Sequence, residues 1–174
     1  MPKLYKKDSF KDNCGFGLIA NLQGRPSRKI VIDSIEALKS MTHRGGIGSD
    51  GKTGDGCGLM LNINKDFFIK AIKDEQNINL SNRFAIGQLF YFEDFQLVKS
   101  KIKKILNEEG LKLITKRDVP INKDILGHIA LDCIPNIYQI FIESNNNMSD
   151  EEFETALLQS RKFIEEIHLN DEKL

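Results

Sequence analysis

Glycine is concentrated in the first third of the chain, and no other feature of the sequence constrains the fold as strongly. Ten of the 13 glycines lie between Gly15 and Gly58. Glycine permits positive φ angles and a close approach of main chain to main chain or to a ligand. The stretch from Gly45 to Gly58 is therefore predicted to be a tightly turned loop rather than a helix or a strand.

The rest of the sequence alternates loosely between helical and strand-like patterns. Ser27 is a suitable N-cap for a helix over 27–42, and the apolar spacing over 95–109 predicts another helix that stops at Gly110. A capping box from Ser149 to Glu152 predicts a final helix. The remaining expected elements are a helix at 65–73 and strands at 16–22, 59–63, 84–92, 111–115, 129–131 and 138–142. The class is therefore mixed α and β.

Composition excludes several kinds of protein. Apolar residues make up 40% of the 174 positions and charged residues 29%, which is typical of one soluble globular domain or part of a larger one. The 25 basic and 25 acidic residues balance, which argues against a broad nucleic-acid-binding surface. No apolar run approaches the ~18 residues that a membrane helix needs.

The N-terminal leader and the cysteines indicate the compartment. Residues 1–13 are rich in lysine and lack the apolar stretch of a secretory signal. The three cysteines, Cys14, Cys57 and Cys133, form neither a disulfide framework nor a metal-binding pair. We expect a cytoplasmic protein, with Cys57 and Cys133 as inert buried thiols.

One motif in the glycine-rich loop matches the phosphate-binding pattern GxxxxGK[ST]. It runs from Gly46 to Thr53, but the pattern works only when a strand precedes it and a helix begins at its lysine. Here a helix is expected before it, and more glycines follow Lys52. Asp50 and Asp55 would also repel a phosphate. Nucleotide binding at this loop is therefore rejected.

Cys14 begins an apolar run in the sequence Asn13-Cys14-Gly15-Phe16-Gly17. If the bond before it were cleaved, Cys14 would carry a thiol and a free α-amine with a pKa near ~8. Such an amine can activate the thiol of its own residue, as in N-terminal nucleophiles. A small buried residue in a strand is the alternative for an isolated cysteine. The nearby block His43-Arg44-Gly45-Gly46 favours the nucleophile.

Three segments together resemble one family: residues 12–20 (DNCGFGLIA), 41–45 (MTHRG) and 50–58 (DGKTGDGCG). They are similar to the class II glutamine amidotransferase domain that begins the large subunit of glutamate synthase, an N-terminal-nucleophile hydrolase. The likeness extends over almost the whole chain from about Leu4. It implies an α+β fold, a four-layer αββα sandwich, of which residues 14–174 form the N-terminal part. Residues 1–13 would be a propeptide.

The resemblance also implies the roles of particular residues. Cys14 matches the nucleophile that attacks the side-chain amide of glutamine and releases ammonia. Arg44 and Gly45 match the His-Arg-Gly element beside it, with Arg44 organising the site; the alternative for Arg44 is a cap of helix carbonyls. His43 is interpreted as structural rather than as a base. Thr53 to Gly58 match a loop that packs beside the nucleophile, with a structural role only.

In the complete family protein, ammonia reaches a synthase domain that holds FMN and a [3Fe-4S] cluster and aminates 2-oxoglutarate. Electrons come from NADPH through an FAD-containing small subunit, or from another donor in related types. The resemblance thus implies glutamine as the substrate and the synthase domain and small subunit as partners. We expect no cofactor and no metal within this chain, and neither nucleic acid nor membrane as a partner.

Some of the family's functional residues lie beyond the sequence of this chain. The arginine and aspartate that hold the α-groups of glutamine come later, as does the Asn-Gly pair of the oxyanion hole, and no Asn-Gly occurs here. We therefore expect an incomplete piece of the domain, with little glutaminase activity as an isolated 174-residue chain. The alternative is a catalytically silent piece that binds partner subunits. For Asp55 we favour a turn residue bonded to its own backbone over a helper of the loop.

Overall fold

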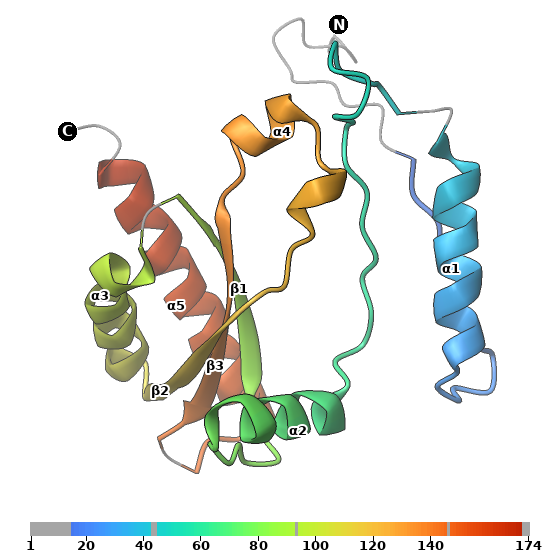
Figure 1. Cartoon of the computed structure of the whole chain (residues 1–174). Helices are drawn as coiled ribbons and strands as arrows, with labels where there is room; N and C mark the ends of the chain where they lie inside the picture. The colour runs from blue at the N-terminus through green and yellow to red at the C-terminus, as the bar shows by residue number, and fades with distance from the viewer. Residues whose placement is uncertain (1–14, 43–44, 93, 146, 172–174) are drawn as a thin grey trace, which may run out of the picture. The chain divides into compact units, whose positions relative to one another are not determined.

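The computed structural model describes residues 15–42, 45–92, 94–145 and 147–171, with side chains to residue 166 (Figure 1). The chain divides into two compact units, and each is described by itself. The first, which we call the loop unit, comprises the chain up to Leu61 together with Gly127–Ile129. The second, the sheet unit, comprises Asn62–Leu126 and the chain from Ala130 onward.

The loop unit contains one long helix, α1 (Arg28–Ser40). The predicted N-cap is confirmed, because the Ser27 hydroxyl accepts a hydrogen bond from the Lys29 amide at 3.2 Å and so satisfies one of the free donors at the helix start. The apolar stripe of α1 is present, yet none of its residues is buried.

Two strands predicted in the loop unit are wrong. Residues 16–22 are irregular and end in a turn, and residues 59–63 are also irregular. Phe16 is 96% exposed and Met60 fully exposed. An apolar run becomes a strand only when a neighbouring strand supplies hydrogen-bond partners, and within the described residues neither run has one.

The sheet unit is built on three antiparallel strands in the order β1-β3-β2. β1 is Ala85–Tyr91, β2 is Leu111–Asp118 and β3 is Asn136–Ser144. One extra residue of β2 between Leu113 and Thr115 shifts the register with β3 and forms a bulge. All three strands were predicted, each with slightly different ends.

Helices cover both faces of the sheet (Figure 1). One face packs against α3 (Phe95–Glu108) and α5 (Asp150–Asp171). The other face packs against α2 (Lys65–Gln76), with Phe141 of β3 at the centre of that cluster. β3 is therefore buried on both sides, because the residues that alternate along it contact different helices.

The helix predictions in the sheet unit are confirmed. In α3 the apolar face is buried as expected, and Gly110 follows the helix with a φ of +73°, a value that favours glycine. At the start of α5 the capping box forms in both directions: the Ser149 amide donates to Glu152 at 2.7 Å, and the Glu152 amide donates to the Ser149 hydroxyl at 3.2 Å.

The predicted strand at 129–131 is wrong, because this segment is part of a short helix, α4 (His128–Asp132). A short 3-10 helix, η2 (Lys123–Ile125), precedes α4. An apolar run of three residues does not distinguish a strand from a helical turn. Ile129 and Leu131 remain 37% and 40% exposed, so burial in a sheet does not organise this segment.

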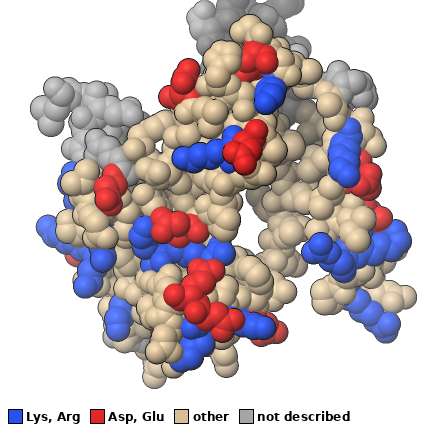
Figure 2. Space-filling view, viewed as in Figure 1, with Lys and Arg blue, Asp and Glu red and all other residues tan. Residues whose placement is uncertain are grey.

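These elements confirm an α+β class with a small antiparallel sheet, while the two-sheet αββα sandwich stays a prediction. Acidic and basic side chains are intermixed on the face seen in Figure 2, in agreement with the balanced charge of the sequence. Among the described residues, no helix is both long and apolar enough to cross a membrane.

Candidate active site

Of the predicted site residues, Cys14, His43 and Arg44 lie outside the described residues, and Gly45 lies within them. The Gly45 amide donates to the carbonyl of Thr42 at 3.2 Å, so the chain turns back on itself where it leaves the end of α1. The glycine-rich loop begins at this turn.

The residue that follows Cys14 in the sequence is packed against the end of α1. A Cβ atom placed on Gly15 would lie 2.5 Å from the Cε atom of Met41. Met41 is the C-cap of α1 and precedes His43 and Arg44 by two and three positions. The Cys14 motif and the His-Arg-Gly motif lie far apart in the sequence, but each is next to one of the two residues, Gly15 and Met41, that are in contact.

The loop after Gly45 is closed at its base by a narrow pair of chain segments. Ile47 and Gly54 form an isolated antiparallel bridge, and the Gly48 amide donates to the Thr53 carbonyl at 2.6 Å. The Asp55 carboxylate accepts a hydrogen bond from the Gly46 amide at 2.7 Å. The preferred interpretation of Asp55 as a turn residue was thus wrong, because its carboxylate joins the two sides of the loop.

Asp50 organises the tip of the loop, a role that the sequence analysis missed. Its Oδ1 atom accepts from the amides of Lys52 and Thr53 at 3.0 and 2.8 Å. Its Oδ2 atom accepts from the Thr53 hydroxyl at 2.6 Å and from the Ile129 amide at 3.2 Å. The side chain is only 3% exposed. The hydrogen bonds from Thr53, which favour the ionised form, hold the pKa of Asp50 well below its ordinary value.

Gly127 begins the segment that contacts Asp50, and there is no room for a side chain at this position. A Cβ atom on Gly127 would lie 2.5 Å from the Thr53 hydroxyl oxygen and 2.7 Å from the Asp50 Cγ atom. Next to it, the Nδ1 atom of His128 lies 3.7 Å from the Asp50 carboxylate, on a side chain that is 73% exposed. The loop and this distant segment of the chain therefore approach as closely as backbone allows.

This geometry supports the rejection of a phosphate-binding loop. No helix begins at Lys52, and the amides of Lys52 and Thr53 donate to the Asp50 carboxylate. A phosphate would have to displace that carboxylate to reach the amides that usually hold it.

The two cysteines within the described residues differ from expectation, because the side chains of Cys57 and Cys133 are both exposed rather than buried. Among the described residues, no group of three or more histidine, cysteine, aspartate or glutamate side chains is arranged to hold a metal ion.

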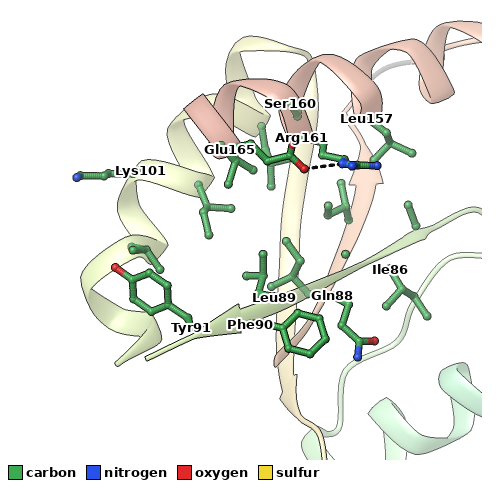
Figure 3. Close-up of a pocket in the computed structure, with 18 of the residues that line it drawn as sticks. Ile86, Gln88, Leu89, Phe90, Tyr91, Lys101, Leu157, Ser160, Arg161 and Glu165 are labelled. Atoms are coloured by element: carbon green, nitrogen blue, oxygen red, sulfur yellow. Dashed lines mark hydrogen bonds and ion pairs between the residues drawn. The ribbon is translucent and has the colours of Figure 1, made fainter. Parts of the chain in front are cut away.

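The sheet unit contains a groove of about 1270 Å³ between β1, α3 and α5 (Figure 3). Its lining is mainly apolar and includes Leu89 and Phe90 of β1. An ion pair between Arg161 and Glu165 lies at its margin at 2.7 Å, and the buried Ser160 hydroxyl has no hydrogen-bond partner among the described residues.

Comparison with known proteins agrees with the motifs. The model of the family "Glutamine amidotransferases class-II" matches residues 14–173, which is nearly the whole chain. The chain belongs to the class II glutamine amidotransferase family. The matched region begins at Cys14, the residue predicted to be the nucleophile.

The chain is also similar to glutamate synthases. It is 40% identical to ferredoxin-dependent glutamate synthase 1 of Arabidopsis thaliana, over 87% of this chain and 10% of that protein. It is 37% identical to the large chain of NADPH glutamate synthase of Azospirillum brasilense, over 92% and 11%. With the large chain of the Bacillus subtilis enzyme the identity is 35%, over 95% and 11%. The chain thus spans about a tenth of the length of these relatives.

Proposed function

We propose that this chain is the glutamine-hydrolysing part of a glutamate synthase large chain, with Cys14 as its nucleophile. Two observations support the proposal: the family match begins at Cys14, and the glutamate synthase relatives cover the same region. Residues 1–13 act as a propeptide, and their removal gives Cys14 a free α-amine. The complete domain adopts the αββα sandwich of N-terminal-nucleophile hydrolases.

The reaction follows from the thiol and the amine of one residue. The α-amine takes the proton of the Cys14 thiol, and the thiolate attacks the side-chain amide carbon of glutamine. The carbon–nitrogen bond then breaks, and the proton held by the amine leaves with ammonia. Water, deprotonated by the same amine, attacks the resulting γ-glutamyl thioester, and breakage of the carbon–sulfur bond releases glutamate and restores the thiol.

Arg44 and Gly45 belong to this site as its neighbours. The contact between Gly15 and Met41 supports this assignment, because it joins the segment after Cys14 to the helix end that leads to Arg44. The Gly45 turn to Thr42 fixes the backbone that follows Arg44. In this arrangement the arginine organises the site, and the backbone at Gly45 allows a close approach to it.

The cofactors and partners of the whole enzyme lie outside this chain. An iron–sulfur cluster is held by several cysteine thiolates, and this chain has three cysteines, one of which is the proposed nucleophile. FMN and the [3Fe-4S] cluster belong to the synthase domain, which uses the ammonia, and a small subunit or another donor supplies electrons. Hydrolysis of glutamine at Cys14 needs none of these groups.

The experiment that tests this function is covalent labelling of the full encoded protein with a diazoketone analogue of glutamine. Mass spectrometry then locates the modified residue and reads the mature N-terminus. We expect modification at Cys14, protection by excess glutamine, and a mature chain that begins at Cys14. The exposed thiols of Cys57 and Cys133 provide an internal comparison. Labelling of all three cysteines alike, or an active protein in which the Asn13–Cys14 bond is intact, would contradict the proposal.

A further inference from the structure

The two carboxylate oxygens of Asp50 have different tasks. Oδ1 accepts from the Lys52 and Thr53 amides, two and three residues along the chain, and so shapes the local turn. Oδ2 also accepts from the amide of Ile129 at 3.2 Å, 79 positions away. A buried carboxylate that satisfies donors from two separate segments holds those segments together.

Gly127 provides an independent indication that this junction is tight. A side chain at this position would overlap the Asp50 carboxylate and the Thr53 hydroxyl. Its backbone is not in the positive-φ region, so the steric requirement, rather than the backbone angle, accounts for the glycine. The four residues Asp50, Thr53, Gly127 and Ile129 form what we call the Asp50 cluster.

The glycine-rich loop connects the Asp50 cluster to the proposed active site. From the Asp50 cluster the chain returns through the bridge between Ile47 and Gly54 to the bond between Asp55 and Gly46. Gly46 is joined through Gly45 to Arg44. A hairpin that is fixed at its tip and closed along its sides has few ways to move its base.

We propose that Asp50 is a positioning residue of the amidotransferase site: by tying the glycine-rich loop to Gly127–Ile129, it sets the position of the Gly45-Gly46 backbone, which follows the proposed site residue Arg44 in the sequence. This inference rests on the proposed function. In this role Asp50 acts through the loop.

The variant Asp50→Asn separates the two tasks of the carboxylate. An asparagine oxygen can still accept from the Lys52 and Thr53 amides, whereas its amide nitrogen can accept neither from the Ile129 amide nor from the Thr53 hydroxyl. We expect the rate at which the glutamine diazoketone labels Cys14 to fall tenfold to a hundredfold, since small displacements in an active site have effects of about this size. Labelling of Cys14 by iodoacetamide, which needs only the thiolate, should change by less than about twofold.

Two further variants provide a control and an independent test of the same junction. Asp94→Asn makes the same chemical change at the N-cap of α3, where the carboxylate accepts from Gln96 at 2.8 Å, and should label like the wild type. Gly127→Ala leaves the charge of Asp50 intact but forces the junction apart, and should reproduce the loss seen with Asp50→Asn. If Asp50→Asn does not fold, Gly127→Ala provides the decision.

The outcomes distinguish the two proposals. Equal slowing of both reagents in Asp50→Asn and Gly127→Ala, or no change with either, would overturn the positioning role. A wild-type protein whose Cys14 reacts with iodoacetamide but never with the glutamine analogue would instead remove the proposed function, and the positioning role with it.

Discussion

The loop unit and the sheet unit are organised by different interactions. In the sheet unit, apolar side chains from β1–β3 and the helices form two buried clusters, one on each face of the sheet. In the loop unit, order within the glycine-rich loop comes from two aspartates that accept hydrogen bonds from backbone amides. The first arrangement depends on buried area, and the second depends on directional bonds and on positions without side chains.

The residues that stabilise the fold by burial and the residues proposed to carry out the chemistry therefore lie in different units. The three segments that carry the resemblance, at 12–20, 41–45 and 50–58, belong to the loop unit, in which no apolar residue that the structure describes is buried. Catalytic residues are commonly placed on loops held by a rigid scaffold, and here the loop has its own internal scaffold of carboxylates. Substitutions in the two units should therefore change different measured quantities.

The largest expected effect is on activity. Cys14→Ala removes the proposed nucleophile and should lower glutamine hydrolysis by the full encoded protein about 10⁴-fold or more. Ammonia release measures this rate, and a denaturant titration should show an unchanged midpoint for the sheet unit. Cys133→Ala, the same change at an exposed thiol of the sheet unit, should leave ammonia release unaltered. Substantial hydrolysis by Cys14→Ala would break the assignment of chemistry to the loop unit.

The next effect is on stability and belongs to the sheet unit. Phe141 of β3 is fully buried, and its ring packs against the rings of Phe68 and Phe84 at centroid distances of 5.8 and 6.0 Å. Phe141→Ala should lower the free energy of unfolding by about 3–5 kcal/mol, through lost burial and the cavity that remains. Urea titration followed by circular dichroism measures the change.

The matched control for Phe141 is Phe90 of β1, which is 62% exposed. Phe90→Ala should cost much less, because most of that ring already contacts solvent. Equal losses for the two variants would mean that the double-sided burial of β3 does not dominate the stability of the sheet unit.

Sequence patterns predicted the sheet unit well, whereas in the loop unit they located α1 and the glycine-rich loop but wrongly added two strands. Apolar periodicity reports burial, and it located α3, β1 and β3 because burial forms them. In the loop unit, the apolar run at 16–22 suggested a strand, but within the described residues it has no strand beside it.

The candidate site shows a similar division. Cys14, Arg44 and Gly45 were identified from motifs, without any geometry. Asp50 was noticed only as a charge that disfavours phosphate, because its bond to Ile129 joins positions 79 residues apart and no local pattern predicts such a contact. A glycine at Gly127 next to the helical turn of α4 was the one available signal, since an isolated glycine often marks a close approach of backbones.

The smallest expected effect tests whether a carboxylate can also stabilise the sheet unit by binding backbone. Hydrogen bonds from Ser149, the amide first, lower the pKa of Glu152 below its ordinary value of 4.5. A group with a lowered pKa in the folded state stabilises the protein above its ordinary pKa, and this contribution disappears as the pH falls below it. Glu152→Gln should therefore lower the urea midpoint slightly at pH 7, and the difference from wild type should shrink as the pH falls from the ordinary pKa through the lowered pKa of Glu152. Glu151→Gln makes the same change in the same helical turn and loses a similar interaction with the helix dipole. The difference between the two variants therefore reports the capping hydrogen bond between Ser149 and Glu152. A difference that grows on acidification would show that the bond from Ser149 does not favour the ionised form.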